Sequence, residues 1–416
     1  MKVTTKFMIA LFALLMLASL TACGQPANTE VAPAAEAEVA ATEPAAAETE
    51  ATEAPAAEPA ASLFAADGRY PVETVKICVE TFDPADAAYM GVQDYYKYLS
   101  ENVFNVEFIY SEKIESAEQE LQFIENCGAA GAKGFVAYYN VSKGQAVAKA
   151  AELGMYFWGT AEEAEIYDAY KTNPYYLGSV INGNGDYDGM YGVTKALIEK
   201  GRTKFIYANG GADFGITMFI NRKAGFTTAV EEATAAGATI TINEVPGFPN
   251  EAWFAAQGAA LASEADAVIT SFGPEVWLQP ISAANKAEVL TIGSFGAISP
   301  SSADLYKQMF DNGMFSAMAT EPSERFGIGI AQIVNAVDGN ADALKENGEA
   351  TRAAQTLWII TNAEDYTKVS GFEMGDGRKE YSKGLVNLIK NINPDASYAT
   401  LVDLIQAYSL EAIVSK

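Results

Sequence analysis

The feature that most constrains the fold is an alternation of short apolar strands with amphipathic helices, which begins at residues 74–84. Ile77 and Val79 are β-branched and lie in a short apolar run, which is typical of a strand covered on both faces. Asp83 and Pro84 end this strand, because proline lacks the N–H that the ladder needs and restricts the residue before it. A helical pattern follows directly. The stretch predicts the first strand, turn and helix of a parallel α/β sheet.

Candidate site residues follow from this first unit. In parallel α/β sheets, ligands bind beyond the carboxyl ends of the strands, so the residues from Glu80 to Asp83 are the first candidates. An ordinary strand end with a solvated acid explains the same residues equally well. At this point the sequence predicts where a site would lie and leaves its ligand open.

The same alternation continues through two similar halves of the chain. Further strands are predicted at 106–110, 134–139, 155–158 and from 175 in the first half, and at 204–208, 239–245, 267–272 and 289–295 in the second. A strand at 315–320 then leads back to the first half, followed by a helix at 322–337 and a last strand at 354–361. The pattern predicts two doubly wound parallel-sheet lobes with a cleft between their strand ends.

The first 63 residues do not fit this pattern. Residues 1–23 have the lysines, the short apolar run and the small residues of a secretory leader, and the run is shorter than the ~20 residues of a membrane helix. Leu20-Thr21-Ala22-Cys23 resembles the lipobox of bacterial lipoproteins, which implies lipidation of Cys23. A plain secretory signal with an incidental cysteine is the alternative. Residues 24–63 are rich in Ala, Glu and Pro without Lys or Arg, which predicts a disordered tether.

The charge of the chain argues against one class of partner. It contains 27 basic and 54 acidic residues, a net charge of −27, and no basic patch offsets this excess. A nucleic acid is therefore not expected as a partner.

The two cysteines beyond the leader leave the redox state open. Cys78 lies in the first predicted strand and Cys127 at the end of a predicted helix. A disulfide is compatible with an exported chain, but two buried thiols are the simpler interpretation.

Several kinds of chemistry find no support in the sequence. Histidine, the commonest general base and metal ligand, is absent, and no nucleophile elbow, phosphate-binding loop or Cys-x-x-Cys pair occurs. Asp186 and Asp188 resemble half of a calcium loop, but helix capping explains them better. Glu80 and Asp83 are a carboxylate pair that could in principle serve a glycosidase, but acids at an exposed strand end are common. We therefore expect a binding protein without metal or cofactor.

Three short motifs carry a resemblance to a known family. Asn221-Arg222-Lys223-Ala224-Gly225-Phe226 resembles the Arg-x-x-Gly-Phe motif of sugar-type periplasmic binding proteins. The segment 178–189 resembles their Ser-Asp-Asn…Gly segment, and Asp83-Pro84 their Asn-Asn-Pro turn. The order of elements from residue 71 to about 370 is similar to the type I, ribose-binding-like fold.

This resemblance implies a function and a domain plan. It implies a monomeric extracytoplasmic receptor, anchored to the cell membrane through Cys23, that delivers a sugar or sugar derivative to the permease of an ATP-binding-cassette (ABC) importer. The compartment is a periplasm or a cell surface. The lobes are expected at 64–180 plus about 321–350 and at 181–320 plus about 351–370, with crossings near 179–183, 319–323 and 348–353 and a helical extension at 371–416.

The resemblance also assigns candidate ligand-binding residues. Arg222 matches an arginine that donates to ligand oxygens, a task that suits its rigid fork, and its replacement by alanine is expected to weaken binding with little loss of stability. The other matching or neighbouring positions are Phe82, Asp83, Tyr138, Trp158, Phe248, Phe272, Phe295 and, at the second crossing, Thr320 or Glu321.

Several of these positions are aromatic where the family usually has hydroxyl-binding groups. Aromatic rings stack on the C–H face of a sugar, on a nucleobase or around a cation. A nucleoside or another aromatic solute is therefore the alternative ligand, and a sensing subunit for a membrane signalling protein is the alternative function. Each ring could also belong to the core, and Arg222 to the surface.

Overall fold

The computed structural model describes residues 62–375 and 377–416. The predicted leader with Cys23 and nearly all of the predicted tether at 24–63 lie outside the described residues.

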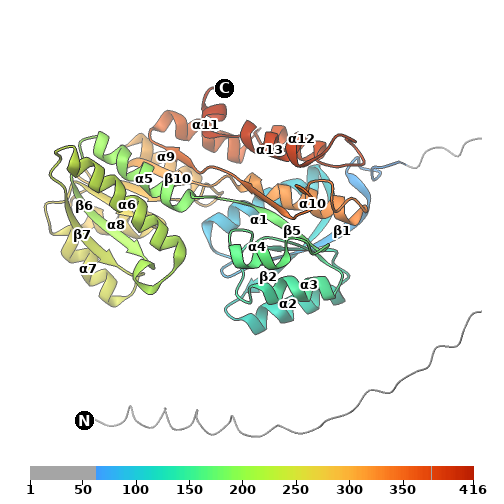
Figure 1. Cartoon of the computed structure of the whole chain (residues 1–416). Helices are drawn as coiled ribbons and strands as arrows, with labels where there is room; N and C mark the ends of the chain where they lie inside the picture. Colours follow the sequence, from blue (N-terminus) through green and yellow to red (C-terminus); the bar gives the residue numbers. More distant parts are fainter. Residues whose placement is uncertain (1–61, 376) are drawn as a thin grey trace, which may run out of the picture. The chain divides into compact units, whose positions relative to one another are not determined.

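The first lobe is built on a six-stranded, all-parallel sheet with the strand order β11-β5-β4-β3-β1-β2 (Figure 1). Its strands are β1 (Tyr70–Thr81), β2 (Phe104–Lys113), β3 (Gly134–Ala137), β4 (Tyr156–Trp158), β5 (Tyr176–Ile181) and β11 (Thr351–Ala354). Its helices are α1 (Ala87–Asn102), α2 (Ala117–Ala129), α3 (Gly144–Glu152), α4 (Ala164–Tyr170) and α10 (Phe326–Val337).

The second lobe has a sheet of the same size with the order β12-β10-β9-β8-β6-β7, in which only the pairing of β12 with β10 is antiparallel. Its strands are β6 (Lys204–Gly210), β7 (Thr241–Pro246), β8 (Ala267–Thr270), β9 (Thr291–Phe295), β10 (Phe315–Thr320) and β12 (Trp358–Ile360). Its helices are α5 (Gly185–Glu199), α6 (Thr217–Ala235), α7 (Glu251–Leu261), α8 (Glu275–Ala283) and α9 (Ala303–Asp311), with a 3-10 turn η1 (Ala212–Phe214).

Both faces of each sheet are covered, as the apolar strands require. Alternate residues of a strand point to opposite faces. In the second lobe, Ile206 packs in one cluster with Trp253 of α7, whereas its neighbour Phe205 packs in another with Met190 of α5. In the first lobe, Ile77 and Cys78 divide in the same way between two clusters. The prediction of two doubly wound parallel-sheet lobes is confirmed.

The chain crosses between the lobes three times. The first crossing joins β5 to α5, and the second joins β10 to the 3-10 turn η2 (Ser323–Arg325) and α10. The third lies between β11 and β12, at 355–357, and the prediction of 348–353 was wrong. Since β11 pairs in parallel with β5, residues 351–354 belong to the first sheet and not to the second lobe, where they were expected.

Four helices form the C-terminal extension: α11 (Ala363–Met374), α12 (Gly377–Asn387), α13 (Tyr398–Ala407) and α14 (Leu410–Val414). The extension begins at residue 363, earlier than the predicted 371. Asn362 caps α11, because its side chain accepts a hydrogen bond from the N–H of Asp365 at 2.9 Å. The extension (red in Figure 1) contacts both lobes, since α11 packs against α9 and α12 packs against α10.

Cys78 of β1 and Cys127 of α2 form a disulfide with a Cα–Cα distance of 6.3 Å. The interpretation of two buried free thiols was therefore wrong. The interpretation failed because α2 covers the face of β1 on which Cys78 lies. The spacing of the two cysteines in the sequence does not reveal this contact.

Replacing Cys78 and Cys127 together by alanine should lower the free energy of unfolding by about 3–4 kcal/mol. The bond closes a loop across 49 positions, and its loss frees that length of chain in the unfolded state. Urea unfolding of the double variant measures the loss. Intact mass with and without reductant provides the control, because the oxidised chain is lighter by two hydrogen atoms. A single mass for both samples would contradict the bond.

The described residues contain neither a candidate membrane-spanning helix nor a cluster of metal-ligating side chains. None of the helices in 62–375 and 377–416 is long and apolar enough to cross a membrane. Within the same residues, no group of three or more Cys, Asp or Glu side chains is placed to hold a metal ion.

Candidate functional site

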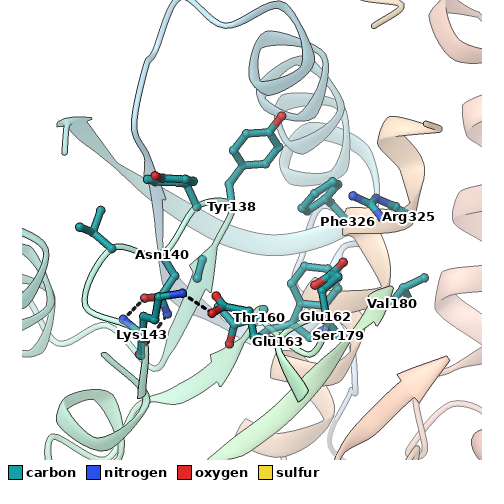
Figure 2. A pocket seen from close by; sticks show the side chains of 15 residues that line it. Tyr138, Asn140, Lys143, Thr160, Glu162, Glu163, Ser179, Val180, Arg325 and Phe326 are labelled. Atoms are coloured by element: carbon teal, nitrogen blue, oxygen red, sulfur yellow. Dashed lines mark hydrogen bonds and ion pairs between the residues drawn. The ribbon is translucent and has the colours of Figure 1, made fainter. Parts of the chain in front are cut away.

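A cavity of about 390 Å³ lies at the carboxyl ends of β3, β4 and β5. Most of its lining comes from the ends of β3 and β4 with the segments that follow them, within 137–143 and 158–163, and from residues 179–180 near the end of β5, and Arg325 and Phe326 complete it (Figure 2). This is the edge at which parallel sheets place their ligands. The cavity is therefore the candidate site.

The backbone around the cavity adopts conformations that side chains disfavour. Lys143 and Thr160 have φ angles of 56° and 62°, and both line the cavity. Gly159, between β4 and Thr160, has φ 135°, where a Cβ would lie 2.6 Å from the carbonyl oxygen of Ala137. Backbone strain of this kind persists where the surrounding fold enforces it, and it concentrates at ligand sites.

Two polar groups of the lining have hydrogen-bonding capacity left for a ligand. The carboxyl group of Glu162 is bonded only to its own backbone N–H, and the hydroxyl of Thr160 is buried without a hydrogen-bond partner. The side chain of Glu162 is exposed but lies in a recess, where desolvation raises the pKa of its carboxyl and the charge of Arg325 opposes this shift. By contrast, Glu163 is paired with Lys143. The lining thus offers one free carboxyl and one free hydroxyl to a ligand.

Arg325 forms the floor of the cavity at the second crossing. Its guanidinium pairs with Glu321 and donates to the side-chain oxygen of Asn182, which lies at the first crossing. The amide of Asn182 in turn donates to Glu321. The guanidinium carbon also lies 4.8 Å from the ring centre of Phe326. Two of the three lobe crossings are therefore linked by one polar network, and Arg325 of this network lines the site.

The structure divides the predicted residues of the first lobe. Tyr138 and Trp158 line the cavity. Trp158, however, is only 2% exposed, and its indole N–H donates to Gln332 at 2.8 Å, so it contributes a wall and no free donor. Phe82 and Asp83 are outside the lining; Phe82 packs on Tyr139 with ring centres 5.0 Å apart.

Arg222 lies outside the cavity lining, buried in the second lobe. It is 8% exposed, pairs with Asp186 at 2.8 Å and donates to the carbonyl oxygen of Ser271. Its guanidinium carbon lies 3.7 Å from the ring centre of Phe295. Asp186, which we interpreted as a capping residue, is instead the ion-pair partner in the first turn of α5.

The rest of the Arg-x-x-Gly-Phe motif has packing roles. A Cβ at Gly225 would lie 2.2 Å from the carbonyl oxygen of Tyr187, so glycine lets α6 approach α5 closely. The ring of Phe226 stacks on Tyr207 with 3.9 Å between centres. The motif therefore anchors α6 to the core of its lobe.

The remaining predicted residues do not line the cavity. Phe248 and Phe272 belong to one aromatic cluster of the second lobe, with 6.0 Å between their ring centres. Glu321 reaches the site only through its pair with Arg325. The structure thus brings Tyr138 and Trp158 together at one cavity and places the aromatic residues of the second lobe elsewhere.

Glu80, the first acid singled out in the sequence, is a buried residue with 1% exposure. It lies against Glu120, which is also fully buried, and burial and the charge of Glu120 raise its pKa well above the ordinary value. The Glu120 carboxylate accepts hydrogen bonds from the backbone N–H groups of Val141 and Ser142, which precede α3. Glu120 therefore holds the loop at 140–143, and Glu80 is buried beside it.

Sequence reasoning missed the groups that are free to bind. Glu162 and Thr160 follow β4 by only two to four residues, so the strand-end rule could have included them. Arg325 could not be found in this way, because it reaches the cavity from the turn η2 after the second crossing.

Comparison with known proteins shows the fold of the chain. No protein-family model and no curated protein matches it. Among solved structures, an ABC transporter periplasmic solute-binding protein from Actinobacillus succinogenes 130z with bound D-allose is similar, with a TM-score of 0.53 and 15% identity over 70% of this chain and 99% of that chain. A carbohydrate transporter from Acidothermus cellulolyticus 11B in complex with myo-inositol has a TM-score of 0.52 and 14% identity over 72% and 98%.

The same fold also serves a different function. The transcription regulator CcpA of Lactococcus lactis matches with a TM-score of 0.50 and 15% identity over 70% of this chain and 98% of that chain. Similarity at these identities shows architecture alone. The chain has the fold of the type I periplasmic binding proteins.

Proposed function

We propose that the protein is an extracytoplasmic solute-binding lipoprotein that takes up a sugar or sugar derivative at the cavity beside Arg325 and delivers it to an ABC permease. The observation that carries the proposal is the pair of free polar groups, Glu162 and Thr160, beside aromatic rings at the strand ends. A carboxylate and a hydroxyl accept hydrogen bonds from sugar hydroxyls, and aromatic rings cover the C–H face of a sugar.

The charge of the site narrows the class of ligand. The two basic residues of the lining, Lys143 and Arg325, are paired with Glu163 and Glu321, so Glu162 leaves the site with a net negative charge when it is ionised. An anionic ligand would be repelled. A neutral polyol or an amine-bearing sugar fits the lining better than a sugar phosphate or a sugar acid.

The location of the protein follows from other features. The leader and the Leu20-Thr21-Ala22-Cys23 segment support export and anchoring through Cys23. The Cys78–Cys127 disulfide is the form that persists in oxidising compartments outside the cytoplasm. Both support a receptor tethered to the outer side of the cell membrane.

Thermal unfolding in the presence of candidate solutes tests the proposal. D-allose, myo-inositol and other neutral sugars are compared with nucleosides on the chain purified from residue 24. A ligand at 100 times its Kd should raise the free energy of unfolding by about 2.7 kcal/mol. If only nucleosides stabilise the protein, its ligand is an aromatic solute and not a sugar. If neither class stabilises it, both ligand proposals are wrong.

Glu162→Gln should weaken binding of the stabilising sugar at least tenfold, because hydrogen bonds to charged groups contribute about 1.5–3 kcal/mol. The matched control is Glu165→Gln, which makes the same change on α4 outside the cavity lining. Titration calorimetry measures both. Equal affinities for the two variants would remove Glu162 from the site.

A further inference from the structure

The turn η2 is held from two sides by two different networks. On one side, Arg325 reaches into the cavity and pairs with Glu321. On the other side, the N–H of Ser323 donates to Glu373 Oε1 of α11 at 3.2 Å, and Glu324 accepts from Arg378 Nε of α12 at 3.3 Å. A single turn therefore separates the floor of the site from the C-terminal extension.

The contact with the extension is a buried cluster of charges. Arg378 is 6% exposed and pairs with Asp94 of α1 as well as with Glu324. Glu324 and Glu373 are essentially fully buried, and each has one carboxyl oxygen without a hydrogen-bond partner. Three acids thus surround one arginine, and burial together with the charge of Glu324 raises the pKa of Glu373, which favours its neutral form.

The extension is also anchored on the second lobe. The hydroxyl of Tyr366 in α11 donates to the carbonyl oxygen of Ala303 at the start of α9, at 2.8 Å. The indole N–H of Trp358 in β12 donates to the carbonyl oxygen of Tyr408, at 3.1 Å. A rotation of the lobes about their crossings must therefore move the extension relative to η2 or carry η2 with it.

We propose that the C-terminal extension is part of the binding device: Arg378 and Glu373 hold the turn η2 and so position Arg325 at the floor of the site. Neither residue lines the cavity, so each acts on the ligand only by positioning Arg325 through η2. This inference rests on the proposed function for its ligand, but the position of η2 can be measured without any ligand. It gives the extension a role in affinity in addition to stability.

The cluster gives this positioning a pH dependence. Burial raises the pKa of Glu373 well above its ordinary value, and the charge of Glu324 raises it further. Ionisation of Glu373 as the pH rises through this raised pKa would place three negative charges around Arg378 and loosen the contact with η2. The titratable and charged groups around the cluster of Glu324, Glu373 and Arg378 are Arg325 of η2, Asp94 and Tyr95 of α1, Tyr366 of α11, and Tyr381 of α12.

Arg378→Gln tests the positioning in the full chain. Hydrogen exchange of residues 323–326 should become about tenfold faster than in the control, and the Kd for myo-inositol or D-allose should rise by a similar factor. The control is Glu380→Gln, an exposed residue of the same helix that is paired with Lys383. If exchange and affinity both match the control while the variant unfolds at a lower temperature, the extension only stabilises the fold and the inference is wrong.

Glu373→Gln tests the same contact without removing a charge partner, and it serves where Arg378→Gln does not fold. Glutamine keeps a hydrogen-bond donor toward Glu324 and cannot ionise. We expect wild-type exchange of residues 323–326 below the raised pKa of Glu373 and no loss of protection as the pH rises through it, after correction for the intrinsic exchange rate. A wild-type protein whose protection at 323–326 does not change with pH would contradict the role of Glu373. If neither sugar binds, the proposed function fails, but the exchange measurements still decide the positioning.

Discussion

Replacing Arg222 by alanine is expected to lower the free energy of unfolding by about 2–4 kcal/mol, because it leaves Asp186 without its partner in a largely buried position. The side chains of Arg222 and Asp186 are 10% and 24% exposed, which places the loss toward the lower part of this range. The variant also loses the hydrogen bond to the Ser271 carbonyl and the contact with the ring of Phe295. Desolvation raises the pKa of Asp186, and the charge of Arg222 opposes this rise. At low pH, protonation of Asp186 therefore makes the loss of unfolding free energy in Arg222→Ala smaller.

The neighbouring residue provides the control for this prediction. Lys223 pairs with Asp213 and Glu244, but its side chain is 36% exposed, and exposed pairs contribute less than about 1 kcal/mol. Urea unfolding of Arg222→Ala and Lys223→Ala measures the two losses side by side. Equal losses would show that the buried pair stabilises the lobe no more than a surface pair does.

This expectation differs from the one drawn from the sequence, which predicted weaker binding with little loss of stability. The resemblance of Asn221-Arg222-Lys223-Ala224-Gly225-Phe226 to a family motif located a real structural feature and predicted a contact of the arginine with the ligand. In the structure, Nε of Arg222 donates to Asp186 and Nη1 donates to the carbonyl oxygen of Ser271. A motif thus indicates that a residue type is needed at a position, and only the surrounding side chains show for what purpose.

The fold could be predicted because strand and helix periodicities are local properties of the sequence. The strands that were found, such as β1 and β6, are apolar on both faces, since helices cover both sides of each sheet. The strand β11 was missed because it is four residues long and alternates buried and exposed positions at the edge of its sheet. The disulfide and the contacts of the extension depend on which helix covers which strand, and no local pattern specifies this.

The site was only partly predictable for a related reason. The strand-end rule selects a region of the sheet, and it led to Tyr138 and Trp158. It does not distinguish an acid that points into the cavity, such as Glu162, from one that is buried behind it, such as Glu80. The direction of each carboxyl group depends on the path of the backbone at the strand end and on the neighbouring side chains that pack around it.

The buried acids predict a stability that falls as the pH rises. In the folded protein, the pKa of Glu80 lies well above the ordinary value, mainly through burial and then through the charge of Glu120. The unfolded chain therefore loses this proton at a lower pH than the folded chain does. Above about pH 4.5 the folded state holds more protons, so its stability decreases by up to about 1.4 kcal/mol per pH unit for each such group until the folded pKa is reached. Glu373 contributes with the same sign.

Glu80→Gln isolates this contribution. Glutamine keeps a hydrogen-bond donor toward Glu120 and does not ionise, so the variant should gain stability over the wild-type protein as the pH rises from about 4.5, with the slope given above. Urea unfolding across this pH range measures the difference. Parallel profiles for the two proteins would show that folding does not change the pKa of Glu80 and would contradict its raised value.

Glu120→Ala should have the opposite and larger effect near neutral pH. It leaves the backbone N–H groups of Val141 and Ser142 without their acceptor in a poorly solvated position, at about 1–3 kcal/mol for each group. Since these residues carry the loop that lines the cavity, the variant should lose ligand affinity together with stability, whereas Glu80→Gln should keep the affinity and gain stability. Comparison of the two variants by unfolding and by sugar titration therefore separates the acid that holds the site loop from the acid that is only buried beside it. If Glu120→Ala binds the sugar as tightly as the wild-type protein does, the loop at 140–143 does not depend on this carboxylate.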